Sequence, residues 1–254
     1  MSIVLAAVDP SPVTPAVVAA ARALAHLAGA TVDVVHVAVD GRSTAEPGLP
    51  VDGMTVRTLH GPVEAGLVQA LGADDVIAGV FGARAARGGR VPTGRTALHV
   101  LERATKPVVV VPPDGPGSAR PIQRLLLPLE GTDDTSRAVL EGLDPLLARP
   151  VELVVLHVFT PATMPRVLDR PARDLSMLSE EFVARFCPGA ARVELRTGAV
   201  GKRVDEACAD CDVDLVVLSW SQDMSPGHAA VVRQILATST LPVLLLPASA
   251  GPTG

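Results

Sequence analysis

The stretch IVLAAVD, residues 3–9, decides the fold because the chain contains a second stretch of the same pattern. Its counterpart is RLLLPLE, residues 124–130, and both are apolar runs closed by a carboxylate. Twenty-seven positions beyond each carboxylate stands a histidine, His36 in the first copy and His157 in the second. Self-similarity at a fixed spacing is the sequence signature of repeated units. The chain is therefore predicted to contain two copies of one folding unit.

Within the first copy, short apolar runs alternate with segments that have apolar residues at helical spacing. The expected strands are residues 3–8, 32–38, 54–59, 75–78 and 107–111, and the expected helices are 13–28, 62–71 and 95–104. Strands that are apolar on both faces and separated by helices indicate a parallel sheet covered on both sides. The sequence predicts an α/β fold with two tandem doubly wound, Rossmann-like domains.

The domain boundary is expected in DGPGSARP, residues 114–121, whose Gly, Pro and Ser content is typical of a linker. The first domain is then residues 1–113 and the second is residues 122–254. Each ends in an apolar run with prolines at its ends, PVVVVPP at 107–113 and PVLLLPA at 242–248. Prolines in those places suit edge strands, which we expect to pair with one another.

Composition and charge exclude several classes of protein. Aromatic residues make up 2% of the chain and there is no Tyr, so the core must be built from Val, Leu, Ala and Ile. A net charge of -5 gives no footprint for nucleic acid. The start lacks a basic segment and no apolar run reaches eighteen residues, so neither a signal peptide nor a membrane span is expected. Three cysteines imply no disulfide framework and fit a cytoplasmic protein.

A ligand crevice is expected where the strands end. In doubly wound sheets it lies outside the carboxyl ends of the strands, where the strand order reverses. Asp9, Val37 and Gly79 are each expected at such an end. Gly79 and Gly82 allow the backbone to approach a ligand closely. Gly94 opens a helix whose free N–H groups and dipole favour an anion.

Basic residues follow these glycines. Residues 79–106 carry a net charge of +5, which leaves -10 for the rest of the chain; the charges are Arg84, Arg87, Arg90, Arg95, Arg103 and Lys106 against Glu102. A positive crevice in an acidic protein suits phosphate capture. The alternative is a solvated loop, the usual role of a charge run. The glycine spacing favours phosphate binding.

These residues resemble the universal stress protein family over nearly the whole chain, as a tandem pair. The resemblance rests on the strand ending in Asp9, the HV pair at 36–37, the GP start of the helix near residue 62, the G-x-x-G at 79–82 and Gly94. It implies that the terminal strands join the domains into an internal pseudo-dimer. It also implies an adenine nucleotide and an unidentified protein partner.

The resemblance further implies which residues hold the nucleotide. In the family's nucleotide-binding branch the pattern is G-x2-G-x9-G-[ST], whose glycines and hydroxyl contact ATP phosphates. Gly79, Gly82 and Gly94 match the glycines with two extra residues in the loop. Arg95 stands where the family has Ser or Thr, and Thr96 comes one position later. The expected ligand is ATP, with ADP or AMP as alternatives and Mg²⁺ as a companion.

For two further residues the resemblance implies a role in nucleotide binding, and each also has a simpler structural explanation. Asp9 would meet the adenine or ribose edge, or it would cap the helix that follows. Val37 would be the apolar wall beside the base, or plain strand core.

The second copy departs from this pattern. Aligning Asp74 with Asp214 places Ser219, Gln222 and Ala229 where the first copy has its three glycines. A glutamate also replaces the aspartate at the end of the first strand. The nucleotide is therefore expected in the first domain, with a degenerate loop in the second.

Other residues of interest are expected to be structural. Cys208 and Cys211 lie near a helix C-terminus, where the dipole opposes a thiolate, so redox and zinc roles are disfavoured. His36 and His157 lack neighbours at metal-ligand spacing and are expected to pack. Trp220 either stacks on a base or covers an apolar edge.

No catalytic motif occurs, so a dedicated enzyme is not expected, although slow ATP turnover stays open. The first functional hypothesis is an ATP-binding stress or regulatory module, in which the nucleotide favours one of two states. The second is a nucleotide-free interaction or scaffold protein with the same fold. A third is an enzyme on a related nucleotide-binding fold. Nucleotide released on denaturing purified protein would separate the first two.

Overall fold

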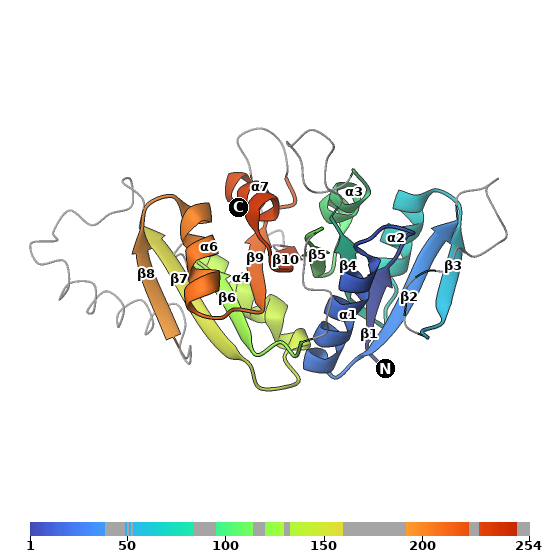
Figure 1. Ribbon diagram of the computed structural model, residues 1–254, viewed down its shortest axis with the longest axis horizontal. Coiled ribbons are helices and arrows are strands. Elements are labelled where there is room, and N and C mark those ends of the chain that lie inside the picture. Colours follow the sequence, from blue (N-terminus) through green and yellow to red (C-terminus); the bar gives the residue numbers. More distant parts are fainter. Residues whose placement is uncertain are drawn as a thin grey trace, which may run out of the picture.

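The computed structural model, drawn in Figure 1, describes residues 1–38, 49, 51, 53–83, 95–113, 120–129, 133–159, 192–223 and 229–247. In the first half of the chain the elements are β1 Ile3–Ala7, α1 Thr14–Ala28, β2 Thr31–Ala38, β3 Val56–His60, α2 Val63–Leu71, β4 Val76–Gly82, α3 Arg95–Arg103 and β5 Val108–Val111. In the second half they are β6 Arg124–Pro128, α4 Asp133–Leu143, η1 Asp144–Leu146, β7 Glu152–Phe159, β8 Arg192–Thr197, α6 Val200–Asp210, β9 Leu215–Trp220, α7 Ala230–Thr238 and β10 Val243–Pro247.

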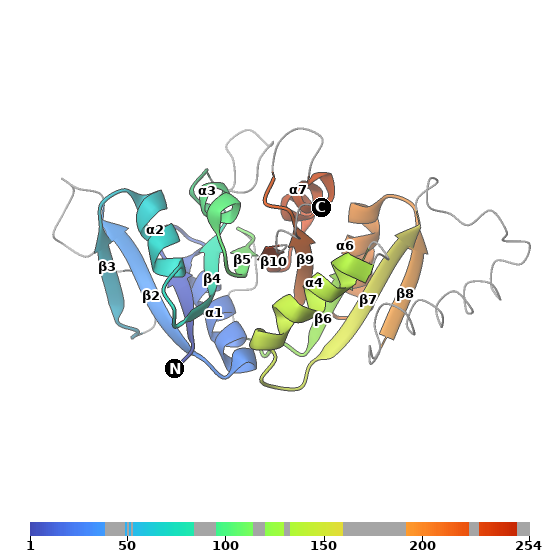
Figure 2. The same cartoon turned by 180° about the vertical axis from the view of Figure 1, so that it is seen from behind.

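The described strands form one continuous sheet in the order β3-β2-β1-β4-β5-β10-β9-β6-β7-β8. All neighbours are parallel except β5 and β10, where Val110 lies opposite Val243 and Val108 opposite Leu245. Figure 1 and its reverse view in Figure 2 show the two halves side by side, with β3 and β8 at the outer edges. The predicted α/β fold and its pseudo-dimer, joined through the terminal strands, are confirmed. The predicted linker falls largely outside the described residues.

Each face of the sheet carries a core that runs through both halves. On one face α1 contributes Val17 and α4 contributes Leu143 to the first core. On the other, Leu101 of α3 and Ile235 of α7 belong to the second core. Strand residues alternate between the two, because successive side chains of a strand point to opposite faces. All four residues of β5 are buried, as a strand covered on both sides requires.

The largest error of the sequence analysis in the first half concerns β4. The expected strand 75–78 runs on to Gly82, so Gly79 lies within the strand and not at its carboxyl end. A Cβ at Gly79 would come 2.6 Å from Phe81 Cε2 and 2.9 Å from Leu71 Cδ1. Glycine within a strand can mark a close approach of neighbouring groups. Here it makes room for the Phe81 ring.

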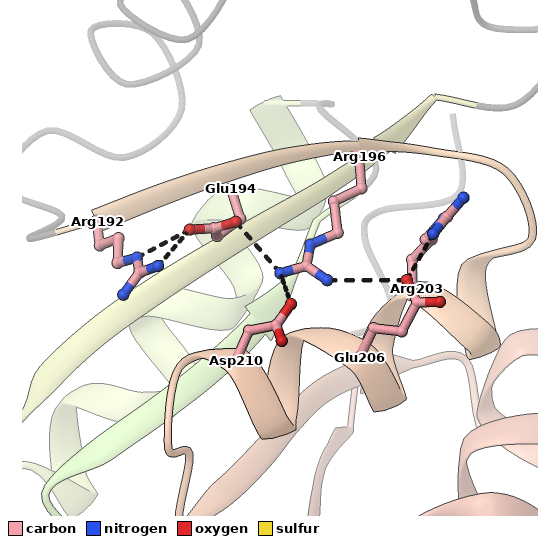
Figure 3. Close-up of polar contacts among 6 residues, drawn as sticks. All are labelled: Arg192, Glu194, Arg196, Arg203, Glu206 and Asp210. Carbon is pink, nitrogen blue, oxygen red and sulfur yellow. Dashed lines mark hydrogen bonds and ion pairs between the residues drawn. The ribbon is translucent and has the colours of Figure 1, made fainter.

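The outer strand β8 is fastened to α6 by ion pairs, shown in Figure 3. Arg196 donates to Asp210 of α6 at 2.9 Å and to Glu194 of its own strand at 3.3 Å. On α6, Arg203 pairs with Glu206 at 2.5 Å. Charges along an edge strand disfavour pairing with the edge of another molecule. This network therefore protects the edge of the sheet while it positions α6.

None of the helices in the described part of the chain is long and apolar enough to cross a membrane.

Candidate functional site

A cavity of about 440 Å³ lies in the first half, at the carboxyl ends of β1, β2 and β4. In the strand order, β1 separates β2 from β4, and the chain winds in opposite directions on its two sides. Doubly wound sheets bind ligands at this switch point. The volume is within the range of about 300 to 1,000 Å³ that is typical of small-molecule sites.

The walls of the cavity are mainly apolar. Val37 of β2 and Phe81 of β4 line it from the sheet, and Val63 and Leu67 line it from α2. Val63 and Leu67 are four residues apart, so both lie on one face of the helix. These side chains form a surface suited to a flat apolar group such as a purine base.

Asp9 lies in the turn after β1, at the polar end of the cavity. The Ser11 backbone N–H donates to Asp9 Oδ1 at 3.2 Å, and Thr14 Oγ1 donates to the Asp9 carbonyl at 2.6 Å. The alternative role of Asp9 as a helix cap is wrong, because the N-cap of α1 is Val13, with no side-chain capping bond. The carboxylate is instead held in place by the turn.

The two repeated histidines fix this turn in each half. His36 Nδ1 donates to the carbonyl of Val8 at 2.9 Å, and His157 Nδ1 donates to that of Leu129 at 2.9 Å. Val8 and Leu129 directly precede the two repeated carboxylates. The constant spacing therefore reflects a structural bond between the second strand and the turn after the first. The described residues contain no group of His, Cys, Asp and Glu that could hold a metal ion.

Two hydroxyl groups add polar character. Ser11 Oγ is buried and has no hydrogen-bond partner among the described residues. Thr96, in the first turn of α3, also lines the cavity. A buried hydroxyl without a partner is unfavourable, and Ser11 is among the residues that line the cavity. Ser11 was missed from the sequence, although its place two residues after Asp9 was visible.

The structure brings together four of the residues expected to bind a nucleotide. Asp9, Val37, Gly82 and Thr96 all line the cavity, whereas Gly79 is not among its lining residues. The expectations for Gly94 and for Arg84, Arg87 and Arg90 fall outside the described residues, as does the side chain of Arg95. The aromatic wall Phe81 was not predicted, since the glycines on either side of it were assigned to a loop.

Strand register corrects the comparison of the two halves. Leu5 lies opposite Gly79, and its counterpart Leu126 lies opposite Val216. Gly79 therefore corresponds to Val216, three positions before the Ser219 expected from the sequence. By the same register Trp220 takes the place of Ala83.

Trp220 is 5% exposed and belongs to the core on the α6 and α7 face of the sheet. The second half thus has a large buried side chain where the first half has a small one beside its cavity. Its burial favours the interpretation that Trp220 covers an apolar edge over the one that it stacks on a base.

Cys208 and Cys211 have the environment of unreactive thiols. Burial, with smaller contributions from Asp205 and Cys211, raises the pKa of Cys208 to about 12. Burial also raises the pKa of Cys211, with a smaller contribution from Glu194. Because the thiolate is the reactive form, neither thiol is suited to redox chemistry near neutral pH.

We therefore expect both thiols to resist iodoacetamide at pH 8 in the folded protein and to react once it is unfolded. The pKa of Cys208 is raised from 9.0 to about 12 on folding. The stability of the fold that is linked to the protonated Cys208 thiol is therefore fully present below pH 9, and it is lost as the pH rises towards 12. Mass mapping of the two labelled positions measures the reaction. Rapid labelling of Cys208 in the folded protein would contradict this assignment.

Comparisons with known proteins found one matching family and several solved structures of similar fold. The Universal stress protein family model matches residues 121–247, which is half of the chain. A functionally unknown protein from Pseudomonas aeruginosa PAO1 has a TM-score of 0.66 at 13% identity, covering 98% of this chain and 93% of its own. A universal stress protein from Archaeoglobus fulgidus DSM 4304 has a TM-score of 0.64 at 13% identity, covering 98% and 97%. No curated protein matches the sequence.

Proposed function

This chain belongs to the universal stress protein family, and from that membership we propose that its first half binds one adenine nucleotide, ATP, as a regulatory ligand. The observation that carries the proposal is the cavity at the β1/β4 switch point, with Asp9 at one end and the first turn of α3 at the other. We further propose that the protein is a cytoplasmic regulator. Its two domains would be residues 1–113 and 122–254, joined by a linker at residues 114–121.

The orientation of the nucleotide follows from the chemistry of the walls. The base lies against Val37, Leu67 and Phe81, where apolar surface is removed from water. The ribose hydroxyls donate to Asp9, because an ionised carboxylate only accepts hydrogen bonds. The phosphates extend away from that carboxylate, towards Thr96 and the N-terminus of α3.

Helix N-termini support the phosphate end of this arrangement. A helix dipole contributes only about 0.3 to 1 kcal/mol at an exposed site, so it does not hold a nucleotide by itself. The arginines between β4 and α3 and the proposed contacts of Gly94 and Arg95 supply the remaining attraction. Mg²⁺ would accompany the phosphates, since it is commonly bound through phosphate oxygens. The proposed role of ATP is to favour one state of the protein.

Titration calorimetry with ATP is expected to give one site per intact chain. Replacing Asp9 by Asn keeps one acceptor oxygen but removes the negative charge, so the hydrogen bonds from the ribose are weakened and affinity should fall about tenfold. The matched control is Asp74→Asn, in the exposed turn before β4 at the opposite end of the strand. It should bind ATP like the wild type.

Two results would contradict the proposal. Two equivalent ATP sites in the intact chain would show that the second half also binds the nucleotide. Absence of bound nucleotide in freshly purified protein, together with no heat of binding, would favour the nucleotide-free scaffold.

A further inference from the structure

The second half reaches across to the far end of a helix that lines the cavity. Gln222 follows β9, and its Nε2 donates to the carbonyl of Leu101 at 3.2 Å and to that of Ala104 at 2.5 Å. Both carbonyls belong to the C-terminal end of α3. The last carbonyls of a helix have no partner within the helix. A side chain from the other half supplies that partner here.

The backbone at Gln222 is adapted to this contact. Its φ is +62°, in the left-handed region that residues other than glycine rarely adopt. The side chain is half-buried, and Trp220 is buried two residues before it. An unfavourable backbone conformation persists only where surrounding contacts maintain it. The two hydrogen bonds to α3 are such contacts.

The opposite end of α3 faces the cavity. Thr96 and Ala97 of its first turn are lining residues, while Leu101 and Ala104 lie at its other end. A nine-residue helix moves largely as a unit. A bond that holds one end of α3 therefore constrains the position of the other.

A second cross-half bond has the same arrangement on α1. Arg149 Nε donates to the carbonyl of His26 near the C-terminus of α1 at 2.7 Å, and the N-terminal residues Val13 and Thr14 of that helix line the cavity. Arg149 is exposed, so its contribution is expected to be smaller. Two of the helices that begin at the cavity, α1 and α3, are thus held at their C-terminal ends by the second half.

We propose that Gln222 is a positioning residue through which the second half sets the nucleotide affinity of the first, by fixing α3 at its C-terminus. This inference rests on the proposed nucleotide site. The coupling is reciprocal, because any effect of the contact on affinity must be matched by an effect of the nucleotide on the contact. The second half is then a regulatory partner of the site.

The test compares variants of Gln222 in the full chain. Gln222→Gly tolerates the positive φ and removes both hydrogen bonds, so ATP affinity should fall about fivefold, within the usual range of coupling between sites. Gln222→Glu keeps the shape but its carboxylate cannot donate, and the same loss is expected. Gln222→Lys restores donors and should recover most of the affinity.

The matched control is Asp212→Gly. Asp212 also has a positive φ, +50°, and is exposed in the same half. The substitution introduces glycine at a left-handed position that does not contact α3, so ATP affinity should not change. An equal loss of affinity in this variant would overturn the proposal, because the effect would then follow from the backbone change.

Amide hydrogen exchange without nucleotide separates this inference from the proposed site. The last turn of α3 should exchange faster in Gln222→Gly and Gln222→Glu than in the wild type and Gln222→Lys. Unchanged exchange, or faster exchange with unchanged ATP affinity, would overturn the coupling. A wild-type chain that binds no ATP overturns the proposed function and the coupling with it, whereas faster exchange would still establish the contact between Gln222 and α3.

Discussion

Replacing Val109 by Asp is expected to leave no folded chain in either half. Val109 is 2% exposed and lies between Val80 of β4 and Leu244 of β10. A carboxylate there would have no partner in an apolar core. Such changes produce the exceptional losses above about 4 kcal/mol, which is much of the about 5 to 15 kcal/mol that stabilises a typical protein.

The measurement uses the position of Trp220, the only Trp of the chain, which lies in the second half. Its emission should shift to that of an exposed indole in Val109→Asp without denaturant, although the substitution is in the first half. The control is Thr58→Asp, an exposed position on the outer strand β3, which should fold normally. Buried Trp220 emission with a cooperative melt in Val109→Asp would show that the second half folds independently.

The repeat carried most of the information about the fold. Apolar runs at residues 3–9 and 124–130 predicted equivalent strands, and β1 and β6 occupy equivalent places in the sheet. The proline-bounded runs predicted edge strands that pair, and β5 meets β10. The first prediction worked because a strand covered on both faces has a continuous apolar sequence. The second worked because an unpaired edge strand exposes backbone hydrogen-bonding groups, and pairing two such edges with each other satisfies those groups.

Glycine was the source of the principal errors. Gly79 was predicted to end a strand, since loops and close packing both favour a residue without a side chain. The sequence of β4 does not show that the Phe81 ring and Leu71 occupy the space beside Gly79. That contact depends on where α2 packs, which the local sequence does not specify. The three-residue error in comparing the halves came from aligning Asp74 with Asp214. The pairing of β1 with β4 also contains a register shift between Ile3 and Val4 that the sequence does not show.

Side-chain contacts across the halves also could not be predicted. Gln222 was noted only as a replacement for a glycine, whereas its amide caps α3. The family model matches the second half, while the cavity lies in the first.

Gly82→Ala is expected to lower both stability and ATP affinity, for a reason that differs from the one the motif suggests. A Cβ at Gly82 would lie 2.5 Å from Val13 Cγ1 and 3.3 Å from Val17 Cγ2. Val13 is buried and its branched side chain has few alternative rotamers. The added methyl should therefore displace the start of α1. Overpacking of this kind costs about 2 kcal/mol, and ATP affinity should fall about 30-fold if binding must reverse the displacement.

A double-mutant cycle distinguishes packing from phosphate contact. Val13→Ala removes the two γ carbons that the new methyl would meet, so the Gly82→Ala/Val13→Ala protein should regain ATP affinity relative to Gly82→Ala. The coupling energy between contacting residues is about 0.5 to 3 kcal/mol. Denaturant unfolding and ATP titration of all four proteins measure it. If Gly82 were instead needed to let phosphate approach the backbone, the added methyl would still block the nucleotide in the double mutant. Val13→Ala would then restore stability but not ATP affinity. Recovery of both stability and ATP affinity would show that Gly82 is required for the packing of α1, the helix whose first turn lines the cavity.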